Sequence, residues 1–197
     1  MKKRTILLAA SLAVTASISL GATLAWLQAE TNTLTNTFTV GQIGLTLDEA
    51  KVERNTVVAD ADRVKDGNTY VLYEGAVLPK DPTVTVTAES ENCYVFMYCD
   101  VSEDLLDITE INYDTSKWLS VGDNIYVYSE NGSEATIVPY AETDTVLSPL
   151  FTTVTVTGDC PENMAEETQI IIKALAYQSN DSSTYSDALA AAKKLWL

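Results

Sequence analysis

Short alternating segments separated by turn signals constrain the fold of this chain more than any other feature. Val84, Val86 and Ala88 alternate with threonines, as in a half-buried strand. Residues 93–99 are apolar on both faces, which is typical of a central strand covered on both sides. Further strands rich in Thr, Val and Tyr are expected at residues 125–128, 151–157 and 170–177. Because no helical pattern alternates with them, the sequence predicts an all-β protein, an antiparallel and jelly-roll-like β-sandwich.

The segments at either end of this region differ in character. In residues 37–47 the apolar phase changes at Gly41, which predicts one bulged strand. Residues 48–68 are charged and poor in apolar side chains, so we expect a loop or a poorly ordered excursion there. A short amphipathic C-terminal helix packed on the sandwich is predicted from apolar residues at helical spacing, namely Ala188, Leu189, Ala192, Leu195 and Trp196.

The first residues have the layout of a secretory signal. Three basic residues precede an uncharged apolar run that ends near Leu20, and small residues follow at positions 23 and 25. We therefore expect residues 1–25 to be a signal peptide, cleaved between Ala25 and Trp26. The alternative is an uncleaved membrane anchor, because Trp26 and Leu27 extend the apolar run. Either way, the remaining chain is expected outside the membrane.

Composition excludes several classes of function. The 197 residues include no His, which removes Ser-His-Asp and Cys-His nucleophile systems and His-based zinc sites. The formal net charge of -16 would repel phosphate backbones, so nucleic acid is not an expected partner. No spacing of ligands predicts a metal site or a cofactor, although Asp60, Asp62 and Asp66 weakly resemble a calcium loop. No catalytic residue is assigned.

The three cysteines and the tyrosines leave alternatives open. Cys93 and Cys99 fall on one face of one strand, too far apart to bridge. Either one could form a disulfide with Cys160, or all three could be buried thiols. The 10 tyrosines could line a glycan-binding face or could simply pack across strands.

One stretch resembles a known family. Residues 21–49 contain Asn36-Thr37-Phe38-Thr39-Val40-Gly41-Gln42-Ile43-Gly44-Leu45, which is similar to the amino-terminal pattern of the TasA/camelysin family of Gram-positive exported proteins. Later patches at residues 80–86, 93–96 and 150–154 also resemble its members. The resemblance implies export with cleavage by a dedicated signal peptidase and a jelly-roll-like sandwich. In the TasA branch it implies biofilm-matrix fibres, in which the new N-terminus inserts as a strand into a neighbouring subunit.

These expectations combine into one functional hypothesis. Residues 26–36 would form a donor-strand segment anchored by Trp26, Leu27 and Leu34, and residues 37–197 would form the sandwich. The chain would be a secreted cell-surface or biofilm-matrix protein that self-associates into filaments, without enzymatic activity. One alternative is a camelysin-like metallopeptidase, which the absence of His disfavours. Another is a surface adhesin that binds cell-wall or matrix polysaccharide.

Overall fold

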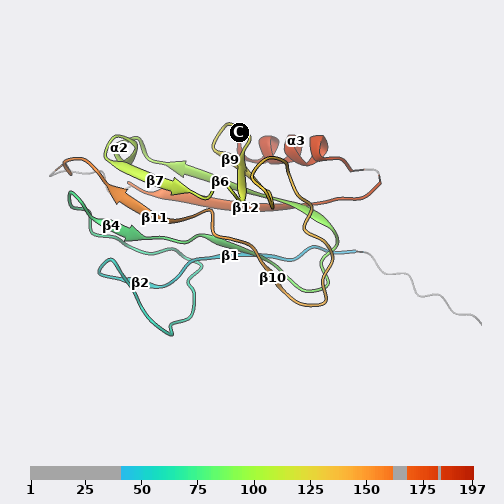
Figure 1. Cartoon of the computed structure of the whole chain (residues 1–197), viewed down its shortest axis with the longest axis horizontal. Helices are drawn as coiled ribbons and strands as arrows, with labels where there is room; N and C mark the ends of the chain where they lie inside the picture. The colour runs from blue at the N-terminus through green and yellow to red at the C-terminus, as the bar shows by residue number, and fades with distance from the viewer. Residues whose placement is uncertain (1–40, 162–167, 182) are drawn as a thin grey trace, which may run out of the picture. The chain divides into compact units, whose positions relative to one another are not determined.

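A computed structural model describes residues 41–161, 168–181 and 183–197 (Figure 1). These residues form mainly antiparallel strands, followed by a short C-terminal helix, which confirms the all-β class. The predicted signal peptide, its cleavage site and the segment 26–36 lie outside the described residues, as do residues 37–40. Within the described part of the chain, no helix has the length and apolar character needed to cross a membrane.

The strands form three larger sheets and one small hairpin. The four-stranded sheet has the order β12 (Ile170–Gln178), β6 (Cys93–Val101), β9 (Ile125–Tyr128) and β8 (Trp118–Ser120). A three-stranded sheet contains β1 (Leu45–Asp48), β5 (Thr83–Val86) and β10 (Thr145–Val146). Another contains β4 (Val77–Pro79), β11 (Phe151–Val156) and β7 (Thr109–Tyr113). The hairpin joins β2 (Val52–Glu53) to β3 (Thr56–Val57), and two helices complete the described elements, α2 (Glu103–Leu106) and α3 (Tyr185–Trp196).

The main core lies between the four-stranded sheet and the two three-stranded sheets. Strand β6 contributes alternate residues to this core, including Val95 and Met97, both fully buried. They pack in one cluster with Val84 of β5, Leu78 of β4 and Val154 of β11. This layering is compatible with a sandwich, while the narrower jelly-roll topology stays a prediction because the strand pairings alone do not establish it.

The opposite face of β6 is covered by α3, which explains why this strand is apolar on both sides. Phe96 is fully buried in a second cluster with Ala188 and Ala192 of the helix. The helix begins with a capping box, in which Thr184 and Asp187 each bond the other's backbone N–H group. The predicted helix and its packing on the sheet are therefore confirmed. Leu195 is a correction, because it is exposed rather than part of the apolar contact.

The first described strand is shorter than the sequence predicted. β1 begins at Leu45, so Gly41 lies before the strand rather than within a bulged one. Gly44 lies close to residues 87–90: its carbonyl accepts a bond from the Thr87 N–H, and its own N–H donates to Ser90 Oγ at 3.0 Å. A Cβ atom at Gly44 would lie 2.1 Å from Thr87 Oγ1, so this close approach requires glycine.

A second glycine supplies a test of the turn chemistry. Gly132 has φ of +71°, and a Cβ there would lie 2.3 Å from the carbonyl oxygen of Thr115. Gly122 has a similar φ of +86° but open space around it. We expect Gly122→Ala to cost about 1–2 kcal/mol of unfolding free energy for the left-handed conformation alone. Gly132→Ala should cost a further ~1–3 kcal/mol because the backbone must move. Urea denaturation of both variants measures the difference, and equal losses would contradict the steric argument.

Candidate functional site

The charged excursion between β1 and β4 is held against the sheets by specific contacts. It contains the β2–β3 hairpin, and Glu49 and Val64 exchange two backbone hydrogen bonds of 2.9 and 2.8 Å. The Val52 N–H donates to Asn68 Oδ1 at 2.7 Å. The expectation of a loop at residues 48–68 is thus confirmed for most positions, but the segment also contains the hairpin and is held in place by these contacts. Its few apolar residues are compensated by hydrogen bonds and ion pairs that periodicity does not reveal.

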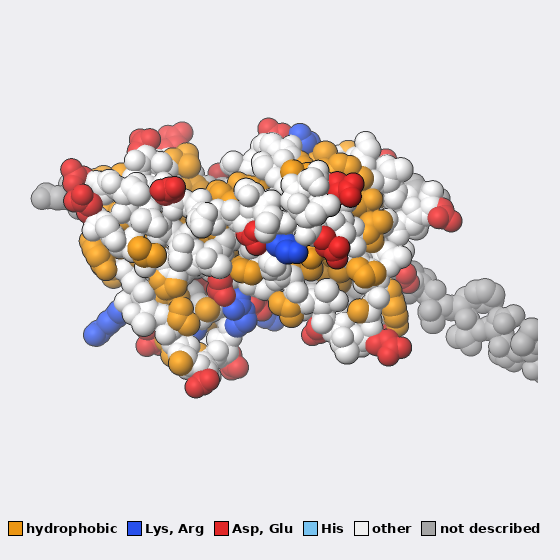
Figure 2. Space-filling model, viewed as in Figure 1, with side chains coloured by type: hydrophobic (Ala, Val, Ile, Leu, Met, Phe, Trp, Pro, Cys, Tyr) orange, Lys and Arg blue, Asp and Glu red, His pale blue; other side chains and the backbone are white. Residues whose placement is uncertain are grey.

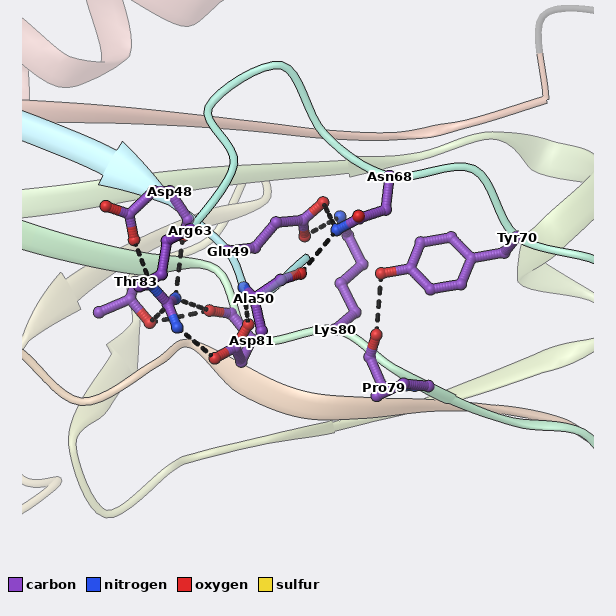
Figure 3. Close-up of polar contacts among 10 residues, drawn as sticks. All are labelled: Asp48, Glu49, Ala50, Arg63, Asn68, Tyr70, Pro79, Lys80, Asp81 and Thr83. Carbon is purple, nitrogen blue, oxygen red and sulfur yellow. Dashed lines mark hydrogen bonds and ion pairs between the residues drawn. The ribbon is translucent and has the colours of Figure 1, made fainter. Parts of the chain in front are cut away.

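Arg63 connects this excursion to the end of the β1–β5 ladder (Figure 3). Its guanidinium donates to Asp48 Oδ1 at 2.5 Å, to Asp81 Oδ2 at 2.8 Å and to Thr83 Oγ1 at 2.9 Å. Partial burial lowers the pKa of Arg63, but the hydrogen bonds and charges of Asp81 and Asp48 outweigh it, so the net pKa is raised. The donors of the guanidinium are spread over three nitrogens and reach acceptors on three residues, a geometry that the single nitrogen of a lysine could not reproduce.

A second polar group lies beside the first and is more deeply buried (Figure 3). Lys80 Nζ donates to Glu49 Oε2 at 2.7 Å, and the two side chains are only 11% and 6% exposed. Asn68 Nδ2 donates to the other carboxylate oxygen at 2.9 Å. The Tyr70 hydroxyl donates to the Pro79 carbonyl at 2.8 Å, and burial followed by the charge of Glu49 raises the pKa of Tyr70.

These polar residues border two adjoining pockets, which together we call the groove. The first pocket has a volume of about 400 Å³, with Leu72, Leu78 and Leu105 among its walls. The second has a volume of about 260 Å³ and runs between the excursion and the start of β12. Residues that line both pockets are Asp66, Gly67, Lys80, Gln169 and Ile170. The groove therefore has walls of mixed apolar and polar side chains, and Lys80, which is 11% exposed and bonded to Glu49, borders both pockets.

The groove borders the start of β12, at residues 170–172. This strand pairs with β6 over all nine residues, and no described strand pairs with its other edge. β1 lies beside it without forming a ladder. Backbone groups of alternate residues in an antiparallel strand point away from the partner, so half of the β12 backbone faces this edge. Its core-facing side chains, including Ile170, Ile172 and Ala174, are only half-buried.

The three cysteines are free thiols in the structure. Cys93 and Cys99 lie in the main core, as their shared face predicted, and burial raises the pKa of each thiol to about 11. Cys160 is half-buried against the same cluster. A disulfide from Cys160 to Cys93 or Cys99 stays a prediction. At neutral pH both core thiols are protonated and therefore poor nucleophiles.

The acidic residues have local structural partners. Asp114 accepts bonds from the N–H and hydroxyl of Ser116, and Asp144 accepts the Ala88 N–H at 2.8 Å. Among the described residues, no group of three or more acidic or thiol side chains could hold a metal ion, and this includes Asp60 and Asp62. On the face shown in Figure 2, acidic side chains are scattered among neutral ones.

The structure brings together residues that the sequence did not single out as a site. Lys80 belonged to a patch of family resemblance, but its pairing with Glu49 has no sequence signal because 31 positions separate them. The predicted anchors Trp26, Leu27 and Leu34 lie outside the described residues, so the structure does not place them. No protein-family model matches the chain, and no curated protein or solved structure is significantly similar to it.

Proposed function

We propose that this chain is an exported structural protein of the cell surface or biofilm matrix, which assembles into fibres by inserting its processed N-terminus into a neighbouring copy. The observation that carries the proposal is the edge of β12. It is nine residues long, unpaired by any described strand, and lined by half-buried Ile and Ala side chains. An edge of this kind is a template for another extended chain.

The donor would be the segment that follows signal cleavage. Residues 26–36 carry Trp26, Leu27 and Leu34 among Thr and Asn, with no Gly or Pro to interrupt an extended strand. Covering apolar side chains at the β12 edge and pairing its backbone would both favour insertion. Because each copy has one donor and one acceptor, head-to-tail insertion does not close on itself and gives filaments.

The remaining features agree with a structural rather than catalytic role. The two core thiols are protonated at neutral pH, Asp114 accepts hydrogen bonds from Ser116, and Asp144 accepts the Ala88 N–H. A dedicated signal peptidase during export and a polysaccharide of the wall or matrix would be the other expected partners.

Removal of the donor segment tests this proposal directly. Negative-stain electron microscopy should show fibres from residues 26–197 and only monomers from residues 37–197, at equal concentration and pH. Circular dichroism spectra of the two chains should agree, because the described strands all follow residue 44. Monomers from both chains, or fibres of equal length from both, would contradict donor-strand assembly.

A further inference from the structure

Some charged residues of the groove are paired with one another, and one exposed lysine is not. Asp48 and Glu49 are neutralised by Arg63 and Lys80, respectively. Lys65 lines the second pocket and is exposed, and it forms no ion pair within the described part of the chain. Because Lys80 uses one of its three N–H donors to bond Glu49, its other N–H groups are available to an acceptor in the groove. The ammonium groups of Lys65 and Lys80 can therefore pair with a negatively charged group in the second pocket, which Asp66 also lines.

The donor segment has one charged side chain that fits this position. Within residues 26–36 the only acidic or basic residue is Glu30. In an extended chain Trp26 and Glu30 fall on the same face, four residues or about 13 Å apart. The groove has a corresponding order, because residues 168–170 line its larger pocket and residues 169–172 line the pocket that contains Lys65.

We propose that the groove binds the first residues of a second copy, with Trp26 in the first pocket and Glu30 in the second, beside Lys65 and Lys80. This inference rests on the proposed function and adds the direction and register of insertion. From the first pocket to the second, the lining residues advance from Thr168, two residues before β12, to Ile172 within it. The donor therefore runs parallel to β12.

The same register places the other two donor anchors. Leu34, four residues beyond Glu30, continues the inward phase toward the half-buried Ala176. Leu27 falls on the opposite face of the donor.

A charge-swap experiment tests this register in the processed chain, residues 26–197. Glu30→Lys and Lys65→Glu should each raise the critical concentration for fibre formation roughly tenfold, because an attraction becomes a repulsion. The double variant should return it to within a few-fold of the unchanged chain. Lys194→Glu is the matched control, since Lys194 is exposed on α3 and far along the chain from the groove, and it should leave assembly unchanged.

Each outcome separates this inference from the proposed function. If the unchanged chain forms fibres but Lys65→Glu behaves like Lys194→Glu, or the double variant is no better than Glu30→Lys, the register is wrong while donor-strand assembly stands. If the unchanged chain forms no fibres, the proposed function and this inference both fail. Equal urea midpoints for all variants establish that the fold is intact, as expected for substitutions at an exposed side chain and ahead of the described strands.

Discussion

Replacing Glu49 with alanine is expected to lower the free energy of unfolding by about 3–5 kcal/mol, because it leaves the Lys80 ammonium buried without its counter-charge. The Lys80 side chain is only 11% exposed, and Glu49 Oε2 lies 2.7 Å from Nζ. Asn68 would also lose the acceptor for one of its N–H groups. Urea denaturation followed by circular dichroism measures this loss.

The chain supplies a matched control for this ion pair. Lys51 and Glu53 also form a pair, at 2.9 Å, but their side chains are 43% and 64% exposed. Glu53→Ala should therefore cost less than about 1 kcal/mol. Combining Glu49→Ala with Lys80→Met should recover much of the loss, since no buried charge then remains. Similar small losses at Glu49 and Glu53 would show that the groove is wet enough to solvate Lys80.

Regular strands were predictable where the alternation was long or the residues were apolar on both faces. Strands β5, β6, β9, β11 and β12 all lie within or close to their predicted segments. β6 shows why: Val95 faces the main core and Phe96 faces α3, so burial on both sides leaves a continuous apolar run in the sequence. The helix was predictable because Ala188 and Ala192 recur at helical spacing.

Other elements are too short to produce a periodic signal. β10 contains two residues and β4 contains three, the last of them Pro79. Their positions are set by neighbours, since Leu78 pairs with Val154 of β11, a partner that sequence separation conceals. β7 alternates correctly, with Ile111 and Tyr113 packed against the core, but it follows a charged segment that hides the pattern.

The candidate site was the least predictable part of the molecule. Glu49 is buried although it lies in a charged segment expected to be a loop, and the Arg63 contacts depend on distant partners at Asp81 and Thr83. Charge counts carry no information about such pairings. In contrast, the donor segment is a prediction from sequence alone, and the structure adds only the unpaired edge of β12 that the proposal requires. The donor half of the assembly hypothesis therefore rests on the sequence, and the acceptor half rests on the structure.

Replacing Trp118 with alanine should also destabilise the fold strongly, by about 3–5 kcal/mol, although no sequence pattern singles out this residue. Trp118 is 1% exposed in the main core, and its ring lies edge-on to Tyr128 with centroids 5.6 Å apart. Its indole N–H donates to the Ser148 carbonyl at 2.9 Å, which joins β8 to the segment before β11.

Two further variants separate the contributions of core packing and of the hydrogen bond to the loss expected for Trp118→Ala. Trp118→Phe keeps most of the apolar volume but loses the bond to Ser148, so it should cost about 1–3 kcal/mol. Tyr140→Ala removes an aromatic ring that is 52% exposed and should have a much smaller effect, within about 0.5 kcal/mol. Urea denaturation of the three variants at matched pH gives the order. If Trp118→Ala costs no more than Trp118→Phe, the hydrogen bond rather than core packing fixes β8. That result would mean that the edge of the four-stranded sheet opposite β12 is held mainly by a single polar contact.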